Sequence, residues 1–363
     1  MLRSIKSNKI KNKFIVMKFS KVVKNLAIFL LILISFVLIL HFVGSSWNRR
    51  TPKGGINESM YVDINGSKQW INIYGKDKNN PVLLYLHGGP GSSTSEIDYA
   101  FTRKWADIYT VVTWDQRNCG KSYDKNQKDI KLAKEIFMED GKVLTEFIRT
   151  YLGVDKISIL GHSWGSLYGA NLVLEYPDYY NLFIGCGQLV DAVENEEAFI
   201  AEARKWAKGD EETLKLLEKI NPEEITKDSI EAKNKILKKY GYSLMKDKPD
   251  YFMPATILFN PNYSIKDWIS YFQRDRQIYL DFFNTDEFKS FSLKGKYDYK
   301  VPYVNINGDM DYTANYKLAQ EYFNRIRAPK KDLYIMKNTS HALMISKSQE
   351  FSDLLHKIYK KYQ

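Results

Sequence analysis

The chain has 363 residues, of which 44% are hydrophobic, so it is long enough to bury a large core in one α/β domain with an insertion. The net charge of +11 belongs to the N-terminus, because residues 1–50 hold ten basic and no acidic residues, whereas residues 51–363 hold 44 basic and 43 acidic ones. The body has no basic stripe interleaved with aromatic residues, which argues against nucleic acid as a partner. Two cysteines, Cys119 and Cys186, are too few for a disulfide framework and are expected to be buried. No metal site and no cofactor are expected.

An apolar segment, residues 26–43, follows a basic tail, residues 1–25. A helix of this length is about 27 Å long, close to the roughly 30 Å hydrocarbon core of a bilayer. The lysines before the segment favour a cytoplasmic N-terminus, with the rest of the chain outside the cell membrane. We therefore expect a single-pass anchor whose partner is the lipid bilayer. The alternative is a cleaved signal peptide that starts at Met17 and releases a secreted protein.

Beyond a linker, residues 44–58, the chain alternates strand and helix patterns through residues 59–188 and again through residues 292–363. Between them, residues 189–291 are charged, aromatic and helix-patterned. This organisation predicts an α/β core with a mostly parallel central sheet and a helical cap inserted in one crossover. Strands are expected at 61–64, 68–74, 82–86, 110–114, 157–160, 182–186, 301–307 and 333–336, and core helices at 135–152, 167–175, 315–326 and 349–361.

The most informative motif is Gly161-His162-Ser163-Trp164-Gly165, which follows an apolar strand and precedes a helix. In that setting a serine lies on a tight strand-to-helix turn, with its hydroxyl above the sheet. Side chains at the two glycine positions would clash with the strand and the helix. The helix N-terminus also directs free N–H groups at a developing negative charge. The pattern alone occurs by chance in other loops, so its partners decide its meaning.

A nucleophilic serine needs a base, and elimination among the five histidines selects His341. His41 lies in the apolar segment, and His162 adjoins the serine and cannot turn back onto it. His87 belongs to an earlier glycine-rich loop. His356 lies in a late helix, where packing or surface exposure explains it. His341 follows the last predicted strand.

An acid must orient this histidine, and two aspartates follow the strand 301–307. Asp311 is the better candidate and Asp309 the alternative, because either carboxylate could simply turn the chain. The order Ser163, Asp311, His341 is the chain order expected of an α/β-hydrolase triad.

The loop His87-Gly88-Gly89-Pro90-Gly91 follows the strand 82–86. Its glycines allow backbone N–H groups to approach a substrate, so we expect it to form an oxyanion hole together with the N–H of Trp164, the residue after the serine. A plain tight turn is the alternative. A phosphate loop is disfavoured because no Gly-Lys-Ser/Thr pattern follows.

Three motifs together resemble the proline iminopeptidase family of α/β-hydrolases, peptidase family S33: H-G-G-P-G at 87–91, D-Q-R-N-C-G-K-S at 115–122 and G-H-S-W-G-S at 161–166. The resemblance covers roughly residues 61–345 and is weak in the insertion. It implies the α/β-hydrolase fold and an aminopeptidase that releases N-terminal residues from short peptides.

By the same resemblance, Ser163, Asp311 and His341 would be the catalytic triad, and Gly89 and Trp164 would supply the oxyanion N–H groups. Asn118 stands where the family commonly has glycine, and asparagine tolerates the left-handed backbone of such a turn.

A second departure concerns substrate binding. Members of the family resemble one another in a W-x-x-W-E stretch of the insertion, whose glutamate helps hold the substrate's amine, and this chain has no such stretch. Acidic residues of the insertion could replace it, although solvated helix faces commonly carry such residues, and the substrate-binding residues stay unassigned. The candidates are Glu194, Glu196, Glu197 and Glu202.

We therefore expect a membrane-anchored serine hydrolase that acts on a short peptide or a small acyl substrate. A carboxylesterase or other small-molecule acyl hydrolase on the same machinery is the alternative. A non-catalytic, surface-tethered binding protein is a third hypothesis, against which the complete triad argues.

Overall fold

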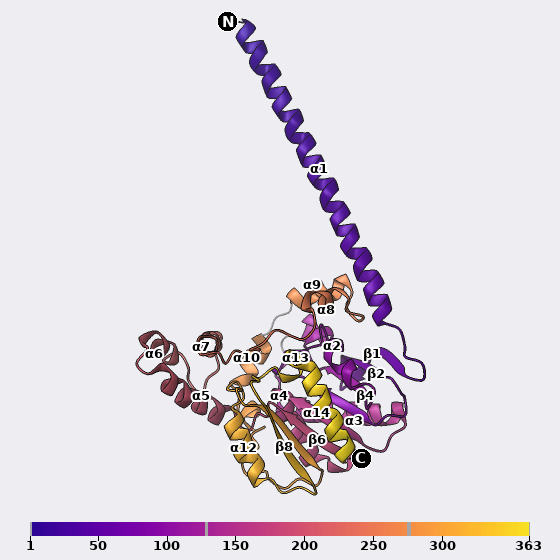
Figure 1. Cartoon of the computed structure of the whole chain (residues 1–363), viewed down its shortest axis with the longest axis vertical. Helices are drawn as coiled ribbons and strands as arrows, with labels where there is room; N and C mark the ends of the chain where they lie inside the picture. The colour runs from indigo at the N-terminus through magenta and orange to yellow at the C-terminus, as the bar shows by residue number, and fades with distance from the viewer. Residues whose placement is uncertain (1, 128–129, 274–276, 363) are drawn as a thin grey trace. The chain divides into compact units, whose positions relative to one another are not determined.

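The computed structural model describes residues 2–127, 130–273 and 277–362 (Figure 1). The chain divides into two parts, which are described separately: Met1–Arg50 with Ile257–Pro261, and the remainder. In the first part, α1 (Leu2–Asn48) is a single helix, and its stretch Lys21–Asn48 is long and apolar enough to cross a membrane.

The connection after α1 is shorter than the predicted linker, residues 44–58. The helix continues to Asn48, and the first strand already starts at Ile56. The helix ends shortly before Pro52, since the residue that precedes a proline disfavours helical backbone. The early strand start was missed because this edge strand is half exposed and lacks a continuous apolar run.

The second part is built on an eight-stranded sheet in the order β1-β2-β4-β3-β5-β6-β7-β8. The hairpin β1–β2 and the pair β2–β4 are antiparallel, and the other neighbours are parallel. The prediction of a mostly parallel sheet is confirmed. The strands are β1 (Ile56–Ile64), β2 (Ser67–Gly75), β3 (Val82–Leu86), β4 (Thr110–Asp115), β5 (Ile157–His162), β6 (Tyr180–Cys186), β7 (Tyr303–Gly308) and β8 (Lys331–Met336).

Local sequence explains several of these elements. Asn65 and Gly66 both have positive φ, as a two-residue hairpin turn requires, and Ile64 pairs with Ser67 across them. Strand β3 is buried along its whole length, as its uninterrupted apolar sequence predicts. Strand β7 starts at Tyr303 and not at residue 301, because Pro302 has no N–H for the ladder.

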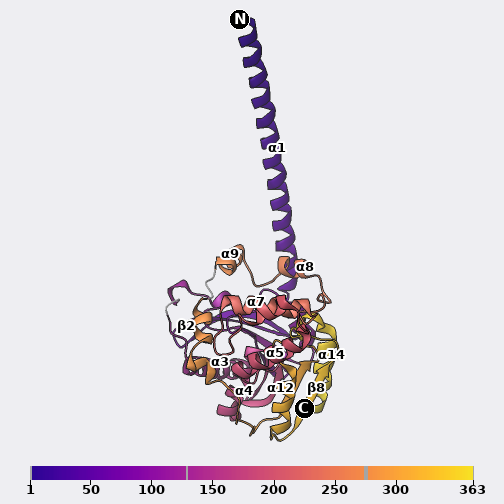
Figure 2. The same ribbon diagram turned by 90° about the vertical axis from the view of Figure 1, so that its left-hand side faces the viewer.

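Helices cover both faces of the sheet (Figures 1 and 2). One hydrophobic cluster joins one face to α3 (Lys134–Leu152), α4 (Trp164–Glu175) and α12 (Tyr316–Arg325). A second cluster joins the other face to α2 (Tyr99–Thr102) and α14 (Ser348–Tyr362). The four predicted core helices are confirmed within a few residues at their ends, whereas the short helix α13 (Leu343–Ser346) was not predicted.

The strand order reverses at β3, because the chain continues to β4 on one side and to β5 on the other. In open α/β sheets, ligands bind outside the carboxyl ends of the strands at such a switch point. Leu86 of β3 pairs with Gly161 of β5, so these two strands end at the same level. The loops that follow them therefore open at one edge of the sheet.

The segment between β6 and β7 is helical in its described residues, as the pattern of 189–291 predicts. Asn221-Pro222, Pro249 and Asn260-Pro261 all fall between helices, since proline interrupts the hydrogen bonding of a helix interior. The inserted helices are α5 (Ala192–Ala207), α6 (Glu211–Leu217), α7 (Lys227–Lys239), α8 (Met253–Leu258), α9 (Ile265–Gln273), α10 (Gln277–Phe283) and α11 (Asp286–Lys289).

Candidate active site

Ser163 lies on the sharp turn between β5 and α4, with φ 56° and ψ −122°. A non-glycine residue in this region carries strain of about 1–3 kcal/mol and persists only where its surroundings enforce it. The Ser163 N–H donates a hydrogen bond to the carbonyl oxygen of Cys186 at the end of β6, at 2.9 Å. The backbone geometry is that of the tight strand-to-helix turn that the sequence motif predicts.

The glycines on either side of the serine permit this turn. A Cβ atom on Gly161 would collide with the backbone carbonyl of Gly165, and one on Gly165 would collide with the carbonyl of Leu86. Helix α4 thus starts against both β5 and the end of β3. The predicted clash at these two positions is confirmed.

His341 and Asp311 are in direct contact. The His341 Nδ1 atom lies 2.7 Å from Asp311 Oδ2, and both side chains are almost completely buried. The second carboxylate oxygen of Asp311 accepts the backbone N–H groups of Thr313 and Ala314, each at 3.0 Å. The carboxylate therefore has a fixed orientation toward the imidazole.

The rival acid, Asp309, has different partners. Its carboxylate accepts the backbone N–H of Thr339 at 3.4 Å and lies 3.7 Å from the ammonium of Lys337. Asp309 thus braces the turn that leads from β8 toward His341, while Asp311 bonds to the histidine itself.

His162 contacts the loop that carries His341. Its Nε2 atom donates to the backbone oxygen of His341 at 2.9 Å, and the two ring centroids are 4.7 Å apart. Burial, with a smaller contribution from the neighbouring His341, lowers the pKa of His162 to about 3. A neutral His162 therefore connects the serine turn to the histidine loop, a role that the sequence did not indicate.

The glycine-rich loop after β3 reaches the serine. A Cβ atom on Gly88 would lie 3.1 Å from the Cβ of Ser163, and Gly89 has φ 115°, which favours glycine. His87 is buried under this loop, where its Nδ1 donates to the Gly88 oxygen at 2.8 Å. The N–H of Trp164 lies in the first turn of α4, where helix N–H groups have no intrahelical acceptor.

Gln116 joins the two predicted oxyanion segments. Its side-chain amide donates to the backbone oxygen of His87 at 3.3 Å, and its Oε1 accepts the indole N–H of Trp164 at 3.0 Å. Gln116 is completely buried. This explains why glutamine follows aspartate in the D-Q-R-N stretch, a role that sequence reasoning missed although the motif contained the residue.

The rest of the same stretch is structural. Arg117 forms a bidentate pair with Asp140 of α3, with N–O distances of 2.7 and 2.8 Å, and both side chains are buried. Asn118 has φ 53°, so the expected left-handed backbone is confirmed at this position. Cys119 and Cys186 are buried free thiols.

The first inserted helices contact the loops of Asp311 and His341. The Asn195 amide of α5 donates to the Thr313 oxygen, and its Oδ1 accepts the Asn315 N–H, both at 2.8 Å. Farther along the insertion, the Leu244 oxygen accepts the N–H of Ala342, next to His341, at 2.9 Å. The sequence provided no signal for these contacts.

The last inserted helices pack against Trp164, the residue that follows Ser163. The indole of Trp164 packs against three phenylalanines of α10, α11 and the following turn, with ring-centroid distances of 6.1 Å to Phe282, 5.7 Å to Phe288 and 4.7 Å to Phe291. Tyr279 of α10 closes over Gly91 of the glycine-rich loop. Inserted helices therefore border the candidate site on several sides.

Three of the four glutamates considered for amine binding form ion pairs with lysines. Glu197 is exposed, and the other three form ion pairs: Glu194 with Lys294 at 2.6 Å, Glu196 with Lys233 at 2.5 Å, and Glu202 with Lys317 at 2.8 Å. The Lys317 ammonium lowers the pKa of Glu202. Glu196 and Glu202 are only 14% exposed, so their carboxylates are in largely buried ion pairs, whereas the exposed Glu197 fits a solvated helix face.

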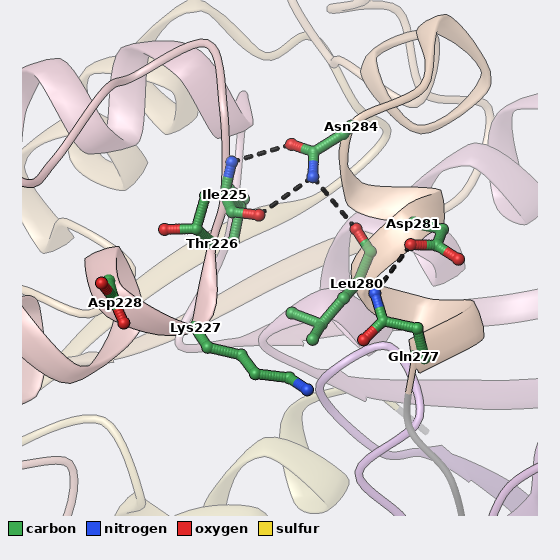
Figure 3. Close-up of a pocket in the computed structure, with 8 residues that line it drawn as sticks. All are labelled: Ile225, Thr226, Lys227, Asp228, Gln277, Leu280, Asp281 and Asn284. Atoms are coloured by element: carbon green, nitrogen blue, oxygen red, sulfur yellow. Dashed lines mark hydrogen bonds between the residues drawn. The ribbon is translucent and has the colours of Figure 1, made fainter.

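A hollow of about 450 Å³ lies within the insertion, between the start of α7 and α10 (Figure 3). The Asn284 side chain crosses it, accepting the Ile225 N–H at 2.8 Å and donating to the Ile225 oxygen at 2.9 Å. None of the residues proposed for catalysis lines this hollow. Asn284 instead ties the first and last parts of the insertion together.

The fold and the serine turn define an α/β-hydrolase. The α/β hydrolase fold family matches residues 81–348, and the chain belongs to this family.

Similar proteins include hydrolases of known name, in sequence and in structure. "Probable aminopeptidase YbaC" of Bacillus subtilis (strain 168) is 25% identical over 306 residues, which cover 81% of this chain and 93% of that protein. A proline iminopeptidase of Mycobacterium smegmatis has the same fold, with a TM-score of 0.55 and 17% identity over 84% of this chain and 98% of its own. A membrane phospholipase A also shares the fold, with a TM-score of 0.57 and 16% identity over 92% and 96% of the two chains. The predicted likeness to proline iminopeptidases is confirmed, and the relatives support a hydrolase.

Proposed function

We propose that the protein is a serine hydrolase in which Ser163 is the nucleophile, His341 the general base and Asp311 the orienting acid. The observation that carries this proposal is the buried 2.7 Å contact between His341 and Asp311, at the sheet edge where the strained Ser163 turn also lies. Asp309 is excluded from the triad in this proposal, because its carboxylate contacts the Thr339 backbone and lies near Lys337.

In the proposed mechanism, the Nε2 atom of His341 accepts the Ser163 hydroxyl proton as the oxygen attacks a substrate carbonyl. Asp311 holds Nδ1–H and stabilises the imidazolium. The N–H groups of Gly89 and Trp164 bind the tetrahedral oxyanion, which is where donors of this kind lower the barrier most. His341 then protonates the leaving group, and a water molecule, deprotonated by His341, releases the acyl group from Ser163.

We infer that the substrate is a short peptide or aminoacyl amide from which the N-terminal residue is released. The support is the likeness to the Bacillus aminopeptidase over most of both chains and to proline iminopeptidases. In this proposal, residues 189–291 are a cap that selects the substrate, because they contact the serine turn and both loops of the His–Asp pair.

A carboxylesterase or other acyl hydrolase is the second candidate, and one observation favours it. The acidic residues that could bind a substrate amine are largely paired with lysines, as in the contact between Glu196 and Lys233. Ester hydrolysis needs no amine-binding carboxylate, and the same triad performs it.

A matched substrate panel separates the two candidates. Aminoacyl-arylamides are compared with their N-acetylated forms and with short-chain aryl esters. An aminopeptidase cleaves the free-amine compounds and loses most of its kcat/KM when the amine is blocked. Cleavage of esters alone, with no effect of blocking, would assign the protein to the esterases. Hydrolysis of no member of the panel, together with an inert Ser163, would leave the binding-protein hypothesis.

We further propose that α1 anchors the protein in the cell membrane through residues 26–43, with a cytoplasmic N-terminus and the hydrolase domain outside. The support is an uninterrupted apolar helix preceded by lysines. Cell fractionation tests this. Full-length protein in the membrane fraction is expected, whereas a shortened protein in the medium would indicate a cleaved signal peptide.

A further inference from the structure

Helix α9 presents apolar side chains to solvent. Ile265, Ile269 and Phe272 follow one another at helical spacing on one face, and they are 57%, 51% and 79% exposed. An amphipathic helix of a soluble domain normally buries such a face.

The opposite face of α9 is firmly docked on the hydrolase core. Its Asp267 carboxylate lies 3.1 Å from the ammonium of Lys121, and its Tyr271 hydroxyl donates to the Glu96 carboxylate at 3.2 Å. The helix is therefore held by its polar and aromatic side, and the isoleucines and the phenylalanine point outward as a consequence of these contacts.

The exposure is local to one stretch of the chain. Among residues 51–362 for which the structure describes side chains, every large apolar side chain that is more than half exposed lies between Leu244 and Phe272. The stretch includes Phe252, just before α8, at 73%. Scattered exposed residues need no explanation, but a gathered apolar surface indicates a partner.

The chain itself indicates which partner. Residues 257–261 bond to the end of the proposed anchor: His41 donates to the Leu258 oxygen at 2.6 Å, and Arg49 donates to the Pro261 oxygen at 2.6 Å. His41 belongs to the apolar segment, so these bonds hold this short stretch at the boundary of a bilayer that the segment spans. Only three residues separate Pro261 from Ile265, which limits the distance between their Cα atoms to about 14 Å.

We propose that α9 is a second membrane contact, which lies in the interface of the same bilayer with Ile265, Ile269 and Phe272 among the upper acyl chains. The inference rests on the proposed anchor and is independent of the proposed catalysis. The exposed Lys266 of α9 suits anionic headgroups. Because Asp267 bonds to Lys121 of the loop after β4, this contact brings one loop of the site's edge to the lipid surface.

Spin labelling of the full-length protein tests this contact in nanodiscs of phosphatidylcholine and phosphatidylglycerol. Labels are attached to Ile269→Cys and Phe272→Cys, with Ile230→Cys, an exposed isoleucine of α7, as the matched control. The native cysteines are buried and stay unlabelled. We expect the α9 labels to collide with oxygen and be shielded from an aqueous nickel chelate, at a depth of about 5–10 Å, and the control label to report water.

A Leu33→Cys label reports the anchor separately. If this label lies in lipid while the Phe272→Cys label is as accessible to the chelate as the control, the inference is overturned and the anchor stands. If both labels report water, the anchor and the inference fail together. Dipolar coupling between α9 labels that persists in detergent would identify a second copy of the chain as the occupant and would also overturn the inference. Reaction of Ser163 with a fluorophosphonate in each variant tests the proposed catalysis independently.

Discussion

The carboxyl edge of the sheet and the inserted helices are held in place by different kinds of contact. At the sheet edge, backbone atoms approach so closely that Gly161 and Gly165 admit no side chain. The insertion is attached by individual side chains, such as the amide of Asn195 and the indole of Trp164. In the proposed function, the sheet edge therefore sets the chemistry, and the insertion selects the substrate through its surface.

The largest effect is expected at the acid of the sheet edge. Asp311→Asn should lower kcat by about 10⁴-fold, because an amide no longer holds the productive tautomer of His341 or stabilises its cation. The matched control is Asp309→Asn, which removes a carboxylate two residues away that bonds to the Thr339 backbone and lies near Lys337. Steady-state kinetics on the best substrate of the panel measure both.

The control should retain activity within a few-fold. A large loss in Asp309→Asn with activity retained in Asp311→Asn would reverse the assignment. Equal losses of activity in Asp309→Asn and Asp311→Asn would mean that catalysis depends on the whole turn after β7 and not on one of its carboxylates.

A smaller effect is expected where the insertion contacts the sheet edge. Asn195→Ala leaves the Asn315 N–H without its partner and removes one donor to the Thr313 oxygen, which still accepts from Lys233 at 3.3 Å. This should lower the free energy of unfolding by about 1–3 kcal/mol. Denaturant unfolding of the detergent-solubilised protein measures it. The exposed Asn234→Ala in α7 is the control and should change stability by less than about 0.5 kcal/mol.

Steady-state kinetics of Asn195→Ala show whether the insertion affects substrate binding or the chemical step. If the insertion only selects the substrate, Asn195→Ala should raise KM more than it lowers kcat. A fall in kcat as large as that of Asp311→Asn would contradict the separation between the two regions, since the insertion would then maintain the triad itself.

A third effect is a pH dependence that arises at His162. Its pKa in the folded protein is about 3, whereas an unfolded histidine titrates near 6.5, so below pH 6.5 the unfolded chain binds a proton that the folded protein does not. Stability should therefore be lost as the pH falls from about 6.5 toward 3, by at most about 1.4 kcal/mol per pH unit from this group. Unfolding curves of the native protein and of His162→Gln, compared between pH 4 and 7, measure the difference.

The variant should have the flatter pH dependence in this range. His356 acts in the opposite direction, because its bond to Asp107 raises its pKa, so His356→Gln should steepen the loss of stability toward acid. Parallel curves for the native protein and His162→Gln would show that the buried imidazole does not control this titration.

The sequence predicted the regions in which one signal dominates. The apolar run of β3 and the turn around Ser163 each follow from a local rule, and both are in the structure. Histidine elimination selected His341 because only five histidines exist in the chain.

What the sequence left open depends on long-range contacts. Two aspartates separated by one residue cannot be ranked by pattern, whereas the fold directs Asp311 toward His341 and Asp309 toward Thr339. The outward apolar face of α9 could not be foreseen either, because the periodicity of an amphipathic helix normally predicts that its apolar face lies against the core.

The most direct test of the account is covalent labelling of Ser163 with a fluorophosphonate, followed by peptide mass mapping of the folded, full-length protein. We expect one adduct, on Ser163, that is absent from Ser163→Ala, while this variant keeps its fold and loses at least about a thousandfold in turnover. No adduct in the folded protein, an adduct at another serine, or retained turnover in Ser163→Ala would contradict the serine hydrolase assignment.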